Sequence, residues 1–68
     1  MIRVRMRSDL IDSGIEFIPT YEQNTFLSAS QIENSQFVSC DDDGVVTLQL
    51  FDGQTQLVDS IDLEYINE

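Results

Sequence analysis

The chain has 68 residues, of which 41% are hydrophobic, and a formal net charge of −10 at pH 7. A chain of this length forms one small domain, residues 1–68, and buries only about 60% of the surface that it exposes when unfolded. No apolar run is longer than two residues, which excludes a transmembrane helix, and the first ten residues lack the apolar stretch of a signal peptide. With a single cysteine a disulfide framework is excluded, so we expect a cytoplasmic protein, in a host cell if it is viral.

The charges are divided sharply along the chain. All three basic residues, Arg3, Arg5 and Arg7, lie in the first seven positions, whereas residues 8–68 hold all 13 carboxylates and no Lys, Arg or His. An acidic surface of this kind repels nucleic acid and anionic membranes and attracts basic proteins. We therefore expect a protein partner with a basic surface, and no direct binding of nucleic acid or membrane. The alternative is that the acidic side chains only keep the domain soluble.

The first seven residues alternate strictly between apolar and basic. Arg3, Arg5 and Arg7 fall on one face, and the opposite face holds Ile2, Val4 and Met6. This period of two predicts a half-buried β-strand. Because opposite charges that face each other across a sheet stabilise it, we expect the arginines to pair with acids of a neighbouring strand rather than to bind phosphate.

The next segment mixes turns with a short strand. Residues 8–14 (SDLIDSG) are rich in turn formers, and Ile15 to Phe17 resume the alternation of a strand. Pro19 lacks a backbone N–H, so it either ends this strand or confines it to a sheet edge. Residues 21–24 are expected to form a loop.

A helix is predicted over residues 29–36. Ser28 is placed to cap it, and Gln31 follows three residues later as in a capping box. Leu27 and Ile32 have the spacing of a hydrophobic staple across this start. The helix would have about two turns, which is too short to persist without packing.

The densest apolar alternation lies in residues 40–66, and we expect the rest of the chain to be organised around this stretch. Residues 45–51 and the segment after Gln54 read as two strands joined by a tight turn at Asp52-Gly53, because glycine accepts the positive φ that such turns need. The apolar residues of the return segment share one parity: Leu57, Ile61, Leu63 and Tyr65. Asp59 falls on this parity too, so a bulge or break is expected near residues 58–60.

A further short strand, residues 37–40, leads into an acidic turn, Asp41 to Gly44. The elements together predict a mainly β protein. We expect a small antiparallel sheet or an SH3-like barrel of four or five strands, with one short helix. A sheet packed on that helix, an α+β arrangement, is the alternative.

Residues 45–66 resemble the C-terminal half of Tudor-like and related SH3-like barrels. The matching parts are the strand 46–51, the turn Asp52-Gly53, the strand 54–58 and the segment 62–66. The resemblance implies a barrel with a 3₁₀ turn that starts at Asp62. Tudor domains that read methylated side chains are expected to carry an aromatic just before the turn glycine, where this chain has Asp52.

The residues that could support catalysis or metal binding are few. The acidic turn resembles the first half of an EF-hand loop, but Leu50 stands where that loop needs a bidentate glutamate, so we expect a solvated turn. Nucleophilic catalysis needs a base beside the nucleophile, and the chain has no histidine or lysine. Cys40 precedes three aspartates whose charge disfavours a thiolate, so we expect it to be a small core residue. We predict no enzyme activity, no cofactor and no metal.

Three functions remain open. The first is an inhibitor that mimics the charge of a nucleic acid, because same-face carboxylates on a strand repeat at roughly 6.6–6.8 Å and Asp59, Asp62 and Glu64 could form such a row. In size and charge the chain resembles small acidic phage-encoded anti-defence proteins, including anti-CRISPR proteins. The second is a structural or accessory subunit, for example of a virion, and the third is a Tudor-like peptide reader. The candidate partner-binding residues are Asp41, Asp42, Asp43, Asp52, Asp59, Asp62, Glu64, Tyr21, Phe26 and Phe51.

Overall fold

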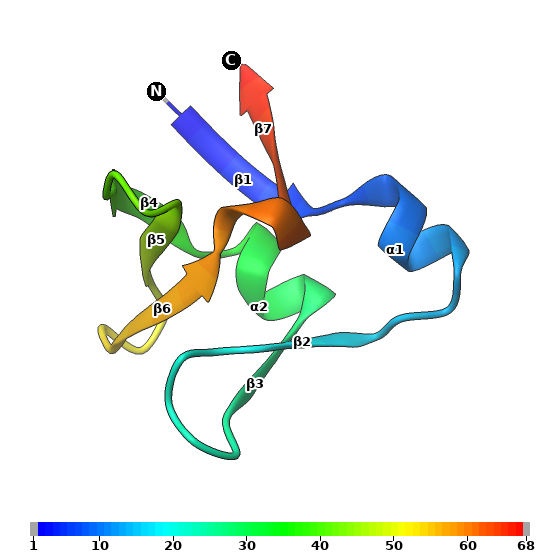
Figure 1. Cartoon of the computed structure of the whole chain (residues 1–68), viewed down its shortest axis with the longest axis horizontal. Coiled ribbons are helices and arrows are strands. Elements are labelled where there is room, and N and C mark those ends of the chain that lie inside the picture. The colour runs from blue at the N-terminus through cyan, green and yellow to red at the C-terminus, as the bar shows by residue number, and fades with distance from the viewer. Residues whose placement is uncertain (1, 68) are drawn as a thin grey trace.

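The computed structural model describes residues 2–67 and confirms a mainly β protein made of small antiparallel sheets (Figure 1). The strands are shorter and more numerous than the predicted four or five, and a second helix precedes the predicted one. In chain order the elements are β1 (Ile2–Met6), α1 (Ser8–Asp12), β2 (Phe17–Pro19), β3 (Phe26–Ser28), α2 (Ala29–Glu33), β4 (Gln36–Cys40), β5 (Val45–Gln49), β6 (Thr55–Asp59), the 3₁₀ turn η1 (Ser60–Asp62) and β7 (Leu63–Asn67).

The strands form three antiparallel sheets, β1–β7, β2–β3 and β4–β5–β6. The predicted hairpin around Asp52-Gly53 is confirmed as β5 and β6, and β4 completes a three-stranded meander. The last strand lies against the first, so that the two ends of the chain are neighbours (Figure 1). This pairing brings Glu64 of β7 opposite Arg5 of β1.

Helix α2 starts as the sequence predicts. Its N-terminal capping box is complete, since the Gln31 N–H donates to Ser28 Oγ at 3.2 Å and the Ser28 N–H donates to Gln31 Oε1 at 2.9 Å. The helix ends at Glu33, earlier than expected, and the Asn34 N–H closes it on the carbonyl of Ser30. Ile32 is fully buried, where α2 packs between β1 and β3.

Helix α1 replaces the turn that was predicted for residues 8–14. It is a single five-residue segment that ends when Ser13 N–H donates to the carbonyl of Asp9, and Gly14 then leaves it with φ +86°. Serine, aspartate and glycine favour both turns and helix ends, so their composition alone does not separate the two. No residue of α1 is buried.

The core draws side chains from nearly every element. Its buried members are Val4 and Met6 of β1, Ile18 of β2, Leu27 of β3, Ile32 of α2, Val46 and Leu48 of β5, Val58 of β6 and Leu63 of β7. Because no strand contributes more than two buried apolar residues, the sheets and α2 depend on one another for burial. Among residues 2–67 no helix is long and apolar enough to cross a membrane.

The predicted parity of the return strand is wrong for β6. Val58 lies opposite Val46 and is fully buried, whereas Leu57 is 44% exposed. The three residues of η1 then interrupt the alternation, so that Leu63 is buried again in β7. The expected break is therefore a 3₁₀ turn at residues 60–62, and it ends at Asp62 instead of starting there.

Because Val58 is buried and Leu57 is exposed, substitutions of these two neighbours should change the free energy of unfolding by different amounts. Val58→Ala should lower the free energy of unfolding by about 2 kcal/mol, at about 0.8 kcal/mol for each methylene-sized group removed plus a cavity term. Leu57→Ala removes more atoms but should cost below about 1 kcal/mol, because its side chain is already half in water. Urea unfolding of both variants measures the difference, and a larger loss at Leu57 would contradict the register.

Candidate protein-binding face

The acidic turn between β4 and β5 is held in a fixed shape by its own first carboxylate. Asp41 Oδ1 accepts from the N–H groups of Asp43 and Val45, both at 2.9 Å. Gly44 completes the turn with φ +83°, a conformation that side-chain-bearing residues rarely adopt. The Ser60 N–H donates to the Gly44 carbonyl at 2.9 Å, which fastens the turn to η1.

Two further carboxylates flank η1. Asp59 caps the 3₁₀ turn, with its Oδ1 accepting from the Ile61 N–H at 3.1 Å. Partial burial raises the pKa of Asp62, and the negative charge of Asp59 raises it further. The positive charge of Arg7 lowers the pKa of the same carboxyl. The ends of η1 therefore place two acids close enough to repel each other.

Tyr21 lies where these two groups of acids meet. Its loop is attached to β6, because the Tyr21 N–H donates to the Leu57 carbonyl at 2.9 Å. Loss of hydration raises the pKa of the Tyr21 phenol, and so do the charges of Asp59, Asp41, Asp43 and Asp62. The side chain is 56% exposed, so its ring remains available at the surface. We call this set the acidic face: Tyr21, Asp41, Asp43, Asp59 and Asp62.

Other expected site residues lie elsewhere. Asp42 belongs to the same exposed turn but is not among the charges that act on Tyr21. Asp52 lies at the opposite end of β5, whose five residues span about 17 Å. Phe51 is next to it and 95% exposed, and Phe26 on β3 is 58% exposed. The structure therefore brings together some of the candidate residues and leaves Asp52 and Phe51 apart, while Phe26 pairs with Pro19 in the hairpin whose loop carries Tyr21.

The expected row of Asp59, Asp62 and Glu64 along one strand does not form. The 3₁₀ turn separates Asp59 from β7, and Glu64 is engaged within the fold. It lies opposite Arg5 in the β1–β7 register and accepts from Arg5 Nε at 2.8 Å and from the Ser8 N–H at 3.0 Å. Hydrogen bonds from Ser8 and Arg5 hold the pKa of Glu64 below its usual range. The predicted pairing of an arginine with an acid on the neighbouring strand is thus confirmed at Arg5.

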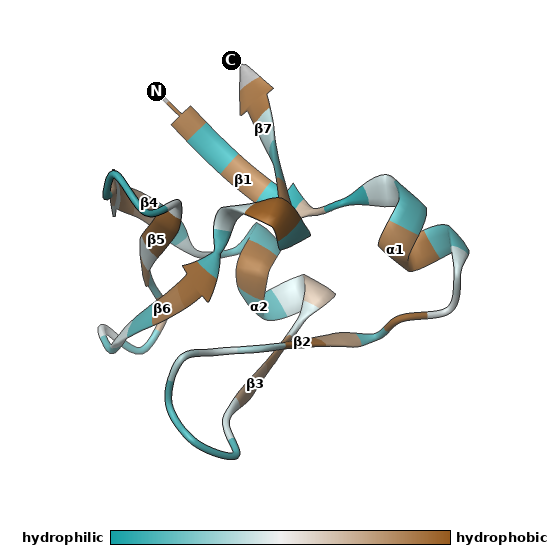
Figure 2. Cartoon of the chain, viewed as in Figure 1, coloured by the Kyte–Doolittle hydropathy of each residue, from teal (hydrophilic) through white to brown (hydrophobic). Residues whose placement is uncertain are grey.

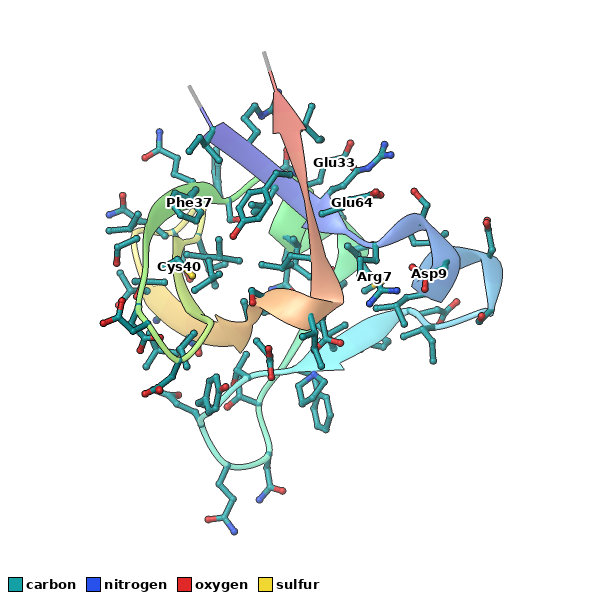
Figure 3. The ribbon with its side chains drawn as sticks, turned by 45° about the horizontal axis from the view of Figure 1, so that its top comes forward. Arg7, Asp9, Glu33, Phe37, Cys40 and Glu64 are labelled. Carbon is teal, nitrogen blue, oxygen red and sulfur yellow. The ribbon has the colours of Figure 1, made fainter. Side chains whose placement is uncertain are left out.

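The other arginines also make contacts within the fold. Arg7 forms an ion pair with Asp9 at the start of α1 and donates from Nη1 to the Ile61 carbonyl at 2.8 Å. Figure 3 shows Arg7 and Asp9 together where β1 leads into α1. Arg3 Nη2 donates to the Glu33 carbonyl at 3.3 Å. The basic side chains therefore support β1 and its neighbours.

The Glu64 contacts predict a pH-dependent contribution to stability. Because the folded pKa lies below the ordinary value of 4.5, the contribution is present above that pH and is lost as the pH falls through the folded value. Glu64→Gln should lower the free energy of unfolding at pH 7, and its difference from the parent chain should vanish in acid. Urea unfolding across the pH range measures this, and a difference that does not change with pH would contradict it.

Asp62 provides a matched control, because the fold raises its pKa whereas the fold lowers the pKa of Glu64. Its folded pKa is raised, so the ionised carboxylate destabilises the fold as the pH rises through that value. Asp62→Asn should therefore be at least as stable as the parent chain at pH 7 and lose that advantage in acid. The two variants remove one charge each and should respond to pH in opposite directions.

Cys40 is exposed, which corrects its predicted place in the core. It ends β4, an outer strand of its sheet, and the register shifts between Phe37 and Ser39, so a regular alternation does not locate its side chain. Phe37 packs edge-to-face on Tyr65 with ring centroids 5.9 Å apart, and burial together with Cys40 raises the pKa of Tyr65. Figure 3 shows Phe37 and Cys40 along the same strand.

In the part of the chain that the structure describes, no group of three or more His, Cys, Asp or Glu side chains is placed to hold a metal ion. Comparison of the chain with protein-family models, with curated proteins and with solved structures finds no match in any of the three.

Proposed function

We propose that this chain is a non-enzymatic protein-binding domain. Its acidic face would occupy the nucleic-acid-binding surface of a basic partner and inhibit that partner as a charge mimic. One observation carries the proposal: the Ser60 N–H donates to the Gly44 carbonyl and the Tyr21 N–H to the Leu57 carbonyl, both at 2.9 Å, and these contacts hold the acidic turn, η1 and an exposed tyrosine together. The mimic would be of the anti-defence kind and would act in the cytoplasm of a host cell.

The geometry supports binding because the charges are ordered before a partner arrives. Asp41 and Asp59 are each held by backbone N–H groups, so less side-chain freedom is lost on association. Charges across an interface set the rate and specificity of association, and an exposed tyrosine among them is a typical anchor of binding energy. The acidic face combines both features.

The non-enzymatic part of the proposal rests on the side chains available. The chain has no histidine and no lysine that could act as a general base beside its one thiol, Cys40. A binding domain of this kind needs no cofactor. The acidic face would act through charge and shape alone.

Capture at two salt concentrations tests the proposal. The tagged protein is mixed with nucleic-acid-binding proteins eluted from a heparin column and washed at about 0.1 M and then about 1 M salt, which shortens the Debye length from about 10 Å to about 3 Å. The captured proteins should leave at high salt and should be displaced by duplex DNA or RNA. A partner that stays at high salt and ignores nucleic acid would contradict mimicry and favour a packed subunit of a larger assembly, such as a virion.

A Tudor-like peptide reader is a second candidate, favoured by the perpendicular rings of Phe37 and Tyr65. Peptides with methylated lysine or arginine would then shift the NMR signals of these two residues. Unmethylated peptides of the same sequence serve as the control, and equal responses to both would exclude a reader.

A further inference from the structure

The β2–β3 hairpin is apolar on both of its faces. Ile18 lies opposite Leu27, and both are 2% exposed on the face that joins the core. Since neighbouring residues of a strand point to opposite faces, Phe17 and Pro19 project outward, and Phe26 lies opposite Pro19 on that outer face. Phe17 is 55% exposed and Phe26 58% exposed. The outer face of an antiparallel hairpin is normally polar, so this one is unusual.

The apolar surface continues from the hairpin toward α1. A hollow of about 580 Å³ is lined by Gly14, Ile15, Glu16, Phe17 and Phe26. A second hollow, of about 490 Å³, shares the segment Gly14 to Phe17 and extends it to Ile11 and to residues 28–30. Figure 2 shows hydrophobic positions along the segment that leads into β2 and on β2 itself. We call this surface the apolar groove: Ile11, Ile15, Phe17 and Phe26.

The exposed apolar area of the groove is large enough to indicate a contact surface. Each aromatic side chain has about 150–250 Å² to bury, so the two half-exposed rings alone leave roughly 200 Å² of apolar surface in water. With Ile11 48% exposed and Ile15 42% exposed, the groove reaches the size of the largest patches on monomers, about 300–600 Å², which are often functional. Single exposed residues such as Phe51 do not form such a patch.

We propose that the apolar groove binds a segment of a partner protein in which arginine alternates with large apolar residues. Glu16 is the ionisable side chain that lines both hollows, and it offers a carboxylate to a guanidinium. The exposed faces of Phe17 and Phe26 attract the same cation, because arginine stacks on aromatic rings. The apolar residues of the segment fill the hollows toward Ile11 and Ile15.

Net charge disfavours two other occupants of the apolar groove, a second copy of the chain and an anionic membrane. A second copy of the chain would bring a net charge of −10 against another −10, and an anionic membrane would meet the same repulsion. The groove and the acidic face share no residue, so this inference does not rest on the proposed charge mimicry. It adds a second surface, selected by shape and apolar contact, to the one that acts by charge.

An NMR titration of the ¹⁵N-labelled protein with three synthetic octapeptides tests the proposal. The peptides alternate Arg with Leu, Arg with Ser, and Glu with Leu. The Arg–Leu peptide should shift the amide signals of residues 11–17 and 26–30. The other two should bind the groove at least about ten-fold more weakly, because each lacks either the apolar side chains or the cation.

Two variants check that the groove is the site. Phe17→Ser with Phe26→Ser should abolish the shifts at residues 11–17, and Glu16→Lys, which keeps both rings, should weaken the Arg–Leu peptide about ten-fold. The variant Asp41→Asn/Asp43→Asn/Asp59→Asn should leave groove binding intact. Shifts confined to residues 41–43 and 59–62, or groove shifts that persist in both groove variants, would overturn the proposal. So would a dimer in sedimentation that Phe17→Ser dissociates, because the occupant would then be a second copy.

Discussion

Replacing Asp41, Asp43 and Asp59 together by asparagine should lower the affinity for a basic partner by about 10- to 150-fold. Exposed ion pairs contribute up to about 1 kcal/mol each, so three of them at about 0.5–1 kcal/mol give about 1.5–3 kcal/mol, and each 1.4 kcal/mol is a factor of ten. Asparagine keeps the side-chain oxygen with which Asp41 and Asp59 accept backbone N–H groups. The turns should therefore hold their shape, and titration calorimetry at several salt concentrations should show a weaker salt dependence.

A variant with the same change in net charge separates a local effect from a global one. Asp12→Asn, Glu33→Gln and Asp52→Asn also remove three carboxylates, but all three lie outside the acidic face and are exposed. This variant should retain most of the affinity. If both triple variants bind equally weakly, net charge alone drives binding and the acidic face has no special part.

Ile32→Ala should lower the free energy of unfolding by about 2–5 kcal/mol, which is a large part of the total for a domain of this size. Ile32 is 0% exposed at the centre of the core, and truncation of a buried isoleucine costs about 2–5 kcal/mol. A domain of 68 residues has a total free energy of unfolding of about 3–10 kcal/mol, at about 0.05–0.15 kcal/mol per residue. Loss of this side chain also removes the surface on which α2 holds β1 and β3. Circular dichroism during urea unfolding measures the effect.

Ile61→Ala is the matched control. It removes the same atoms from a residue that is 65% exposed in η1, so the free energy of unfolding should change by less than about 1 kcal/mol. Equal losses at both positions would show that the core is not centred on α2.

The parts of the fold that follow local rules could be predicted from the sequence. The alternation of β1, the capping box at Ser28 and the Asp52-Gly53 turn each depend on residues a few positions apart, and each has the expected form. The parity of β6 could not be read in the same way, because a leucine and a valine are adjacent and either can face the core. The choice depends on pairing with Val46 in β5, which lies 12 residues from Val58 in the sequence.

The candidate sites depend on tertiary structure more than the secondary-structure elements do. The acidic face combines the β4–β5 turn, the ends of η1 and the loop of Tyr21. The pairing of Val45 with Asp59 and the Ser60–Gly44 and Tyr21–Leu57 hydrogen bonds bring them together. Composition predicted abundant acids but could not show that Glu64 is bound by Arg5 and Ser8 or that Asp52 lies apart. The outward position of Phe17 could not be read from the alternation, because Phe17 and Ile18 are adjacent apolar residues, and the pairing of Ile18 with Leu27 gives the inner face to Ile18.

The most direct test of the central claim is a competition between this protein and nucleic acid for a captured partner. A fluorescent oligonucleotide bound to that partner is titrated with the parent chain and with the variant Asp41→Asn/Asp43→Asn/Asp59→Asn, and anisotropy reports the bound fraction. Binding at the nucleic-acid surface predicts full displacement by the parent chain, and about 10- to 150-fold more of the variant for the same displacement. A ternary complex in which the oligonucleotide stays bound while the protein binds the same partner would contradict it.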